Sequence, residues 1–563
     1  MSAATTWVGR RLTLGVFLAA LLFGLSIDRQ VPWTDDARFY VPAAAAYGRW
    51  LESALAGVSR ADLTPFSQAR LDEAFAVNRE HPPVAKYVMA AGWLLAYRWT
   101  GLLEEVAACR LGVVLLWALM VTLTFAWVRR IAGVGAAGFA AGALVFLPRL
   151  LFDGQVETLD APVAALLTLT GALLFVHLEE PKLVTGVGAV LAFGLALGTK
   201  LNAPFFLLAA VLYLLILRPP RREHTLLASA PIPWVFLGLT LVSPLLVWLS
   251  WPWLWFDTSA RLAAYAQYHL HHYGIFFYYR GQLFGDEVAP WPAPWVMLAV
   301  TTPVTTQLLA LVGAATPTLA ALARVPRIAR RFPNLPDLDT EGANRLGLFA
   351  LLQVVTQLGA VSLPGVPVYG GVKLFLPAFP FLAILAGLGF ARVLASSRAL
   401  ALSARGRLWL GRATAAGLML PAAIAVVAYR GAWLSYYNEP TGGVRGGVAA
   451  GFERQYYDLA YPRLATDLNA LFPDGGRVAV LPNPKEYGPH LERWQRLGAL
   501  SPKVSLVPVE RADLLVLTHE RRWRDYPELF ARYRSRPVRA SFTVAGVPLY
   551  TVLDLRPGAR ASP

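Results

Sequence analysis

Charged residues and cysteine are scarce in this sequence. Asp, Glu, Lys and Arg make up only 15% of its 563 residues, whereas a soluble domain carries about 25%. The one cysteine, Cys109, excludes an intramolecular disulfide bond and a cluster of thiolate metal ligands. Because 56% of the residues are hydrophobic, this shortage of charge excludes an ordinary soluble protein over most of the chain.

Long apolar runs recur from residue 12 to about residue 430 and predict a mainly α, polytopic membrane protein. The first run follows Arg10-Arg11. We interpret it as an uncleaved span rather than a signal peptide, because no small-residue cleavage site precedes Asp28. The predicted spans number about eleven and cover residues 12–27, 106–128, 131–148, 160–178, 183–199, 201–217, 230–251, 293–314, 344–362, 374–392 and 413–430.

Acidic residues are also few beside the basic ones, with 35 Asp and Glu against 51 Lys and Arg and a net charge of +16. So basic a balance can indicate nucleic-acid binding. Here the arginines lie mostly in short loops between apolar runs, which is typical of the cytoplasmic loops of membrane proteins. We therefore expect contact with membrane lipids and no nucleic-acid partner.

The apolar stretch 84–99 is ambiguous, and the basic loops decide its placement. The basic loops share a side with Arg10-Arg11 only if residues 84–99 do not cross the membrane; these loops cover residues 129–130, 218–222, 324–331 and 392–412. We predict that residues 82–99 lie in the outer interface or dip in and out, where Trp93, Tyr97 and Trp99 suit the headgroup region.

This topology divides the chain into a transmembrane module, residues 1–430, and an outer domain, residues 431–563. Residues 28–104 become a first outer loop with interfacial helices. In a bacterium, the outer side is the periplasmic side of the plasma (inner) membrane. The outer domain reads as a small α/β fold without a nucleotide fingerprint. Its expected strands cover residues 478–483, 512–517, 542–544 and 548–553, and its expected helices cover residues 456–471 and 489–497.

An acidic pair, Trp33-Thr34-Asp35-Asp36, lies just after the first span, with Arg38 and Tyr40 close behind. Two adjacent carboxylates can serve as a general base and as a hydrogen-bond partner. The alternative is a helix cap with an acidic first turn.

A second polar segment is Glu80-His81-Pro82-Pro83-Val84-Ala85-Lys86, in which the prolines set a rigid helix entry. Lys86 at the interface could hold a phosphate as a point charge. It could equally be a lysine whose stem lies along an apolar surface while its head reaches water.

Further polar residues lie at the outer ends of the predicted spans. Asp153, Glu157 and Asp160 form an acidic segment beside Arg149; Glu157 and Asp160 would share a helix face and could bind metal, build a hydrogen-bonding shelf or simply cap a helix. Lys200 lies on the outer side, against the positive-inside trend, and Lys373 follows Gly370-Gly371 at the start of a span, where it contacts a phosphate or only marks the interface.

A histidine-rich loop completes the set. It contains His269, His271, His272 and Tyr273, which without spaced acidic partners are a weak zinc signal. Hydrogen bonding to a sugar or phosphate fits better, and a packed aromatic loop is the alternative. Acids, cations and aromatics thus converge on one membrane face, which suits a lipid-phosphate-sugar whose tail lies in the bilayer.

The order of these motifs resembles the dolichyl-phosphate-mannose protein mannosyltransferases and their bacterial relatives, including the aminoarabinose transferases of lipid A. These are glycosyltransferases of the GT-C fold, family 39-like. The resemblance covers about residues 10–455. It rests on the acidic pair, His81-Pro82-Pro83-Val84-Ala85-Lys86, Arg110-Leu111, the acidic segment ending at Asp160, Gly198-Thr199-Lys200, and Ser435-Tyr436-Tyr437-Asn438-Glu439 with Gly442-Gly443.

The resemblance implies a transferase that moves a sugar from a polyprenyl-phosphate carrier to a lipid, glycan or protein acceptor outside the membrane. Asp35 would be the general base, and Asp36 stands where the mannosyltransferases usually carry Glu. The residues that would contact substrate are His81, Lys86, Arg110, Asp160, Lys200, His271, His272, Tyr273 and Lys373. The β-trefoil domain of the mannosyltransferase branch has no match here.

Two other classes remain open at this point. A transporter or flippase would show internal repeats and midplane charges, whereas this chain shows no clear repeat. An oligosaccharyltransferase-like enzyme would need a divalent cation. We expect no resident metal site and treat a divalent cation as an alternative.

Overall fold

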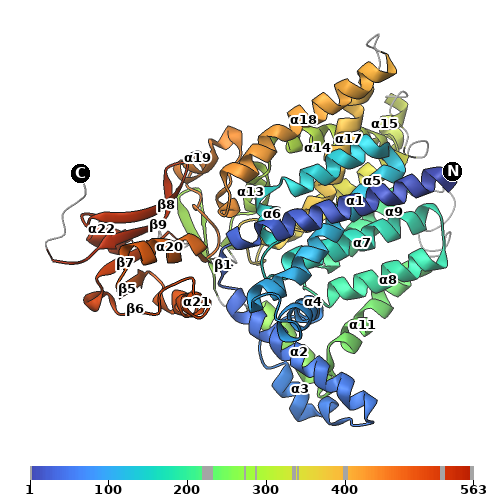
Figure 1. Cartoon of the computed structure of the whole chain (residues 1–563). Helices are drawn as coiled ribbons and strands as arrows, with labels where there is room; N and C mark the ends of the chain where they lie inside the picture. Colours follow the sequence, from blue (N-terminus) through green and yellow to red (C-terminus); the bar gives the residue numbers. More distant parts are fainter. Residues whose placement is uncertain are drawn as a thin grey trace.

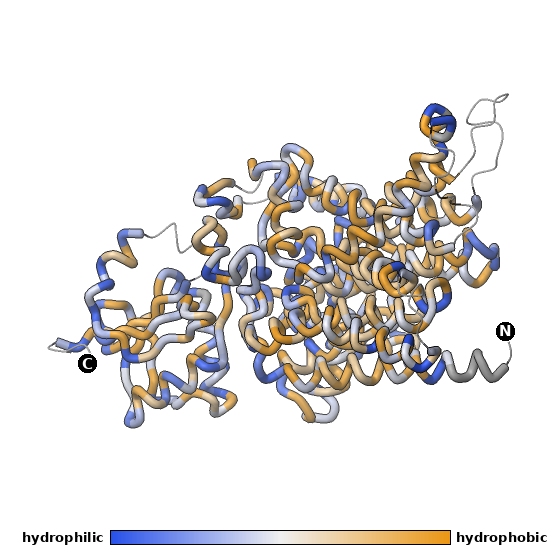
Figure 2. Tube along the Cα trace, turned by 90° about the horizontal axis from the view of Figure 1, so that it is seen from above, coloured by the Kyte–Doolittle hydropathy of each residue, from blue (hydrophilic) through white to orange (hydrophobic). Residues whose placement is uncertain are grey.

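The computed structural model describes residues 3–217, 233–271, 274–285, 288–331, 336, 338, 342–396, 403–519 and 527–557. Figure 1 shows a bundle of helices that carries the N-terminus at one end and a smaller sheet-containing domain at the other. In Figure 2 hydrophobic residues dominate the bundle, whereas the C-terminal domain mixes hydrophobic and hydrophilic residues. The mainly α fold with a small C-terminal α/β part is confirmed.

Six helices in the described residues are long and apolar enough to cross a membrane. They are α1 (Ala3–Ile27), α5 (Glu105–Val145), α7 (Asp160–Glu179), α14 (Val304–Leu322), α17 (Ala378–Ser396) and α18 (Ala404–Ala428). Shorter apolar stretches pack among them: α8 (Leu183–Leu197), α9 (Pro204–Leu217), α10 (Trp234–Leu237), η4 (Gly238–Val242), α11 (Ser243–Ser250), α13 (Ala293–Thr301) and α16 (Gly342–Val361). The protein is therefore a multi-pass membrane protein.

Each predicted span falls on one or more of these helices, but two spans are joined in one helix and another is divided between two. The spans 106–128 and 131–148 are joined in α5, which bends at Gly133, where φ is +83°. The span 293–314 is divided into α13 and α14 at Thr302-Pro303, because a proline there cannot donate to the preceding turn.

The bundle has a basic end, where the arginine-rich loops meet. Arg324 donates to the carbonyl of Leu217 at 2.8 Å. Arg345 pairs with Glu179 at 2.6 Å, and Arg130 pairs with Glu180 at 2.7 Å. Loops far apart in the sequence thus share one end of the bundle, and the N-terminus of α1 lies at that same end (Figure 1).

The stretch 84–99 stays at the opposite end of the bundle. It forms α4 (Val84–Gly92) and a π-helical turn, η3 (Trp93–Arg98). The backbones of α4 and α5 touch: a Cβ at Gly92 would clash with the carbonyl of Ala108, and one at Gly112 with that of Val88. Since α4 reaches only about two turns into the 41-residue α5, it does not traverse the bundle.

The segment 28–104 contains two further helices, α2 (Ala37–Ser59) and α3 (Gln68–Ala74). Between the later spans, the structure adds α6 (Pro148–Asp153), α12 (Thr258–Leu270), α15 (Pro326–Arg331) and a hairpin of β2 (Phe276–Tyr279) with β3 (Gln282–Gly285). Figure 1 shows α2, α3 and α4 on the side of the bundle that faces the C-terminal domain.

The C-terminal domain contains a five-stranded mixed sheet with strand order β6-β5-β7-β9-β8. Its strands β5, β6 and β7 are parallel, and β9 is antiparallel to β7 and β8. The strands are β5 (Gly476–Leu481), β6 (Val504–Leu506), β7 (Leu514–Thr518), β8 (Val538–Val544) and β9 (Val547–Asp554); the helices are α19 (Gly443–Ala449), α20 (Pro462–Leu471), α21 (Pro484–Arg496) and α22 (Pro527–Tyr533).

Two of the expected helices here have different bounds. The helix expected over 456–471 begins only at Pro462, because proline fits the first helical turn and disfavours helix in the residue before it. The helix expected over 489–497 begins already at Pro484. Residues 456–461 are extended instead, and β4 (Leu459–Ala460) pairs with β1 (Trp33–Thr34), which follows α1.

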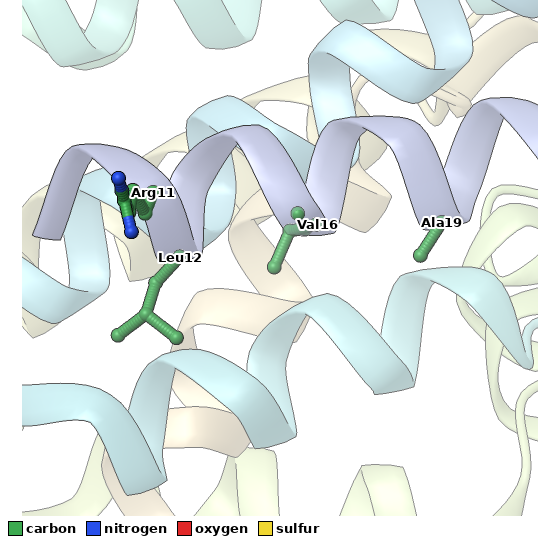
Figure 3. A pocket seen from close by; sticks show the side chains of 5 residues that line it. Arg11, Leu12, Val16 and Ala19 are labelled. Carbon is green, nitrogen blue, oxygen red and sulfur yellow. The ribbon is translucent and has the colours of Figure 1, made fainter. Parts of the chain in front are cut away.

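A hollow of about 420 Å³ runs along α1. Figure 3 shows Leu12, Val16 and Ala19 on one face of this helix, with Arg11 at the end nearer the N-terminus. Apart from Arg11, its lining is apolar. We therefore assign it to the lipid-facing surface of the bundle.

Candidate functional site

Two hydrogen bonds at the end of β1 hold the backbone of the acidic pair. The hydroxyl of Thr34 accepts from the backbone amide of Ala37 at 3.2 Å and starts α2 directly after Asp36. The backbone amide of Asp35 donates to the carbonyl of Asp458 at 3.3 Å. The two carboxylates therefore leave a turn that the C-terminal segment holds in place.

Asp36 faces a lysine and a tyrosine that come from distant parts of the chain. The ammonium of Lys373 donates to Oδ2 of Asp36 at 2.7 Å and to the hydroxyl oxygen of Tyr457 at 2.7 Å. The hydroxyl of Tyr457 in turn donates to Oδ2 of Asp36. This triangle joins the segment between α1 and α2, the short 3-10 turn before α17 and the extended segment before α20.

Asp160 extends this cluster toward a second lysine. It is the first residue of α7 and is 1% exposed, and its Oδ1 accepts from Lys200. Its Oδ2 lies 3.9 Å from the ammonium of Lys373. Two cations and two carboxylates therefore alternate in one largely buried cluster, which the sequence predicted only as separate motifs.

The charges of this cluster depend on one another. Burial raises the pKa of Asp36, but the charge and hydrogen bond of Lys373 and the hydrogen bond of Tyr457 outweigh it and bring the pKa below its ordinary value. Burial lowers the pKa of Lys373, whereas Asp36 and Asp160 raise it above its ordinary range. Both groups are therefore ionised at neutral pH.

Asp153 differs from its acidic neighbours. It ends α6 and is 3% exposed. Burial, with repulsion from Asp160, raises its pKa to about 8. At neutral pH this carboxyl is mainly protonated, so it can donate a hydrogen bond where Asp160 can only accept.

Asp35 points to a different partner. Its Oδ1 accepts from Arg38 at 2.8 Å, and its side chain is 24% exposed. Asp35 thus lies beside an arginine and the C-terminal segment, whereas Asp36 lies against the lysine cluster. The structure separates two adjacent acids that the sequence could only treat as a pair.

A pocket of about 150 Å³ opens next to the lysine cluster. Its polar wall contains His81, Lys200, Asn202, His269 and Tyr369, and its apolar wall contains Leu201, Phe205, Val361, Val366, Pro367 and Leu374. Burial, followed by the charge of Lys86, brings the pKa of His81 well below its ordinary value. His81 is therefore a neutral hydrogen-bonding group at this wall.

Lys86 lies outside the pocket wall. It is fully buried, and its ammonium donates to the carbonyl and side-chain oxygens of Asn78, at 2.6 and 3.1 Å, and to the carbonyl of His81 at 2.8 Å. Three acceptors match the three N–H groups of an ammonium. The expected phosphate contact does not fit this geometry, in which Lys86 holds the turn that presents His81.

The guanidinium of Arg110, like the ammonium of Lys86, bonds to groups of the protein itself. It pairs with Glu157 at 2.5 Å and donates to the carbonyl of Pro32 at 3.0 Å. Glu157 and Asp160 therefore do not share a helix face as expected, because α7 begins only at Asp160 and Glu157 lies in the turn before it. The acidic segment serves two separate clusters.

The histidine-rich loop is only partly described. His271 is an exposed residue at the C-terminal end of α12. The predicted contact residues His272 and Tyr273 lie outside the described residues. It is His269, which was not among the predicted contact residues, that reaches the pocket, where its ring lies 5.6 Å from that of His81.

The sequence did not predict that Tyr457 bonds to Asp36. The helix expected over 456–471 includes Tyr457. Pro462 is the signal against that helix, because a proline disfavours helical backbone in the residue before it. Among the described residues, no group of three or more His, Cys, Asp or Glu side chains is placed to hold a metal ion.

The sequence itself carries a family pattern across this site. Residues 80–248 match the family of dolichyl-phosphate-mannose-protein mannosyltransferases. The match confirms the resemblance to family 39-like glycosyltransferases of the GT-C type, and it includes His81, Asp160 and Lys200. None of the curated proteins compared with the chain matches it by sequence.

Three solved structures that are similar to the chain can be compared with it. ArnT from Cupriavidus metallidurans bound to undecaprenyl phosphate is 18% identical over 100% of both chains, with a TM-score of 0.46. Its apo state gives 17% identity over 98% of both chains and a TM-score of 0.46. The oligosaccharyltransferase AglB from Archaeoglobus fulgidus is 10% identical over 91% of this chain and 70% of AglB, with a TM-score of 0.43.

Proposed function

We propose that this protein is a membrane glycosyltransferase that moves one sugar from a polyprenyl-phosphate carrier to an acceptor outside the membrane. One observation carries the proposal: Lys200 lines a small pocket that is polar on one wall and apolar on the other, and through Asp160 it belongs to a buried cluster with Lys373 and Asp36. The family that residues 80–248 match is named for a dolichyl-phosphate-mannose donor, which belongs to this class of carrier.

The pocket suits the phosphate of such a donor. A phosphate is held by cations and neutral donors, and a prenyl chain by apolar side chains. Lys200 and His81 supply the first kind of contact, and Phe205, Val361 and Leu374 supply the second. Lys373 pairs with Asp36 and lies 3.9 Å from Asp160, the partner of Lys200, so we assign it the phosphate oxygen that leaves.

We assign the general base to Asp35 and the support of Lys373 to Asp36. Asp36 accepts from both Lys373 and Tyr457, and its lowered pKa makes it a weak base. Asp35 lies beside the C-terminal segment, and its side chain is 24% exposed and bonded to Arg38. The acceptor hydroxyl would lose its proton to Asp35 as its oxygen bonds to the anomeric carbon.

In the same step the bond from that carbon to the phosphate oxygen breaks, and the polyprenyl phosphate leaves with the bonding electrons. Attack opposite the leaving group inverts the anomeric centre. Lys200 and Lys373 supply positive charge for this step. We place the reaction on the periplasmic side of a bacterial inner membrane, with the site and the C-terminal domain outside.

The test is transfer by the purified protein in liposomes, with synthetic polyprenyl-phosphate sugars as donors and an extract of envelope lipids, glycans and proteins as acceptors. Asp35→Asn should lower transfer by about 10³-fold or more, while the protein remains monodisperse. Asp62→Asn, which alters an exposed acid in the same loop, is the matched control and should retain full activity.

Full transfer by Asp35→Asn would overturn the assignment of the base. Translocation of the donor across the liposome membrane without any transfer would instead favour the transporter or flippase. Mass spectrometry of surface glycans, lipids and proteins from a deletion strain then identifies the acceptor by the sugar that is lost.

A further inference from the structure

The indole of Trp33, two residues before Asp35, is covered by one helix of the C-terminal domain. Trp33 is 7% exposed. Trp494 stacks on it with ring centroids 5.5 Å apart and an interplanar angle of 28°, and His490 lies 5.7 Å from it. The guanidinium of Arg493 lies 4.8 Å from the centre of the same ring.

These three contacts come from a single face of α21. Residues three and four apart share a face of a helix, so His490, Arg493 and Trp494 present one aromatic and cationic surface to Trp33. A cation over the face of a tryptophan ring is attracted by its π electrons. The sequence therefore places on α21 a surface that matches an indole.

Arg493 also links this surface to the membrane module. Its guanidinium pairs with Glu104, the residue whose carboxylate caps the N-terminus of α5 by accepting from the amides of Val106 and Ala107. Arg493 thus contacts both Trp33 and the start of the helix that carries Arg110.

A second connection runs through the backbone. The hydroxyl of Tyr487, also on α21, donates to the carbonyl of Leu459 at 2.5 Å. Leu459 is the register partner of Thr34 in the β1–β4 pair. The helix therefore holds β1 through the ring of Trp33 and holds the partner strand of β1 as well.

On the opposite side, Arg110 donates to the carbonyls of Val31 and Pro32, at 3.4 and 3.0 Å. The segment that ends in Asp35-Asp36 therefore lies between a buried arginine of the bundle and α21 of the C-terminal domain, and it contacts both. The arginine belongs to the bundle, whereas α21 and β4 belong to the C-terminal domain.

We propose that α21 is a positioning element for the carboxylates of Asp35 and Asp36, with Trp33 and Arg493 as its positioning residues. The proposal rests on the proposed function, in which these carboxylates serve the transfer. It gives the C-terminal domain a task that needs no acceptor contact: docking of α21 fixes β1, and β1 fixes the two acids.

The kinetic test uses Trp33→Ala and Arg493→Ala in the full-length protein. Because a shift of about 1 Å at reacting groups can cost on the order of 10²-fold in rate, Trp33→Ala should lower kcat by about 10²-fold. KM for the donor should stay within about twofold of the wild-type value, because the pocket lined by His81 and Lys200 is not altered. Trp33→Phe keeps a stacking ring and should restore kcat to within about fivefold of the wild type.

Matched controls separate positioning from a general loss of structure. Arg496→Ala removes an exposed arginine of the same helix, and Trp291→Ala removes a tryptophan that is 69% exposed. Both should keep the kcat of the wild type. Equal losses in Arg496→Ala and Arg493→Ala, or a rise in donor KM at constant kcat, would overturn the proposal.

Hydrogen–deuterium exchange of residues 31–38 supplies a readout that needs no activity. Exchange should rise in Trp33→Ala and Arg493→Ala, and it should stay at the wild-type level in Arg496→Ala. Unchanged exchange in both Trp33→Ala and Arg493→Ala would refute the positioning role even if the protein is a glycosyltransferase. Raised exchange in a protein without any transfer activity would instead refute the proposed function and keep the docking contact.

Discussion

Asp36 shows how a single residue acquires its state from distant partners. Burial raises its pKa, and Lys373 and Tyr457 more than compensate, so the acid is ionised in the folded protein. Its folded pKa lies below the ordinary value of 3.8. The pair with Lys373 therefore adds stability above pH 3.8, and this contribution is lost as the pH falls through the folded pKa.

Removing Lys373 should reverse the sign of this dependence. In Lys373→Met, burial is the main remaining influence on Asp36, so its folded pKa should rise above 3.8. The folded state then binds the proton more tightly than the unfolded state, and stability should fall as the pH rises above 3.8. At pH 7 we expect a loss of about 3 kcal/mol in the free energy of unfolding, as for other broken buried pairs.

The measurement is the midpoint of thermal unfolding in detergent between pH 4 and pH 8. The double variant Asp36→Asn/Lys373→Met is the control, because it lacks both charges of the pair. The midpoint of Lys373→Met should fall below that of the double variant progressively toward pH 8. A constant difference across this range would contradict the coupling between the two residues.

At the residue scale, the sequence predicted which polar residues matter better than it predicted what each one does. Asp36, Asp160, Lys200 and Lys373 meet in one cluster, as a shared membrane face implied. Lys86 instead satisfies three buried oxygens. Burial and hydrogen-bond partners arise from tertiary contacts, so a motif cannot distinguish a lysine that meets a ligand from one that ties a turn.

At the scale of elements, the close packing of α4 on α5 sets where the pocket lies. The amide of Val84 donates to the carbonyl of Gly198 at 2.9 Å, so the N-terminus of α4 adjoins Lys200. Gly92 and Gly112 allow the backbones of the two helices to touch. Charge patterns predicted that this stretch does not cross the membrane, but no periodicity in the sequence reveals the glycine contact.

Gly92→Ala should therefore disturb the site from a distance. The new methyl group would clash with the carbonyl of Ala108, which belongs to a helix backbone and cannot rotate away. Overpacking of this kind costs about 1–3 kcal/mol, and we expect a lower unfolding midpoint together with weaker donor binding. Gly138→Ala in α5, where no atom lies within 4 Å of the new Cβ, should leave both unchanged; equal effects of the two substitutions would contradict this account.

At the scale of the whole molecule, the arginine-rich loops and the acidic cluster occupy opposite ends of the bundle, and the C-terminal domain caps the end with the cluster (Figure 1). The positive-inside bias predicts that the end with the arginines faces the cytoplasm. The protein offers a clean way to measure this orientation, because its one native cysteine, Cys109, is fully buried.

We expect cysteines introduced at the two ends to react from opposite sides of the membrane. Lys485→Cys in the C-terminal domain and Arg405→Cys in the first turn of α18 both replace exposed residues. In intact spheroplasts, a membrane-impermeant maleimide should label Lys485→Cys and spare Arg405→Cys, which should react only after lysis. The wild type sets the background from Cys109. Labelling of Arg405→Cys alone would invert the topology and move the carboxylate pair to the cytoplasm, away from a donor whose sugar is presented outside.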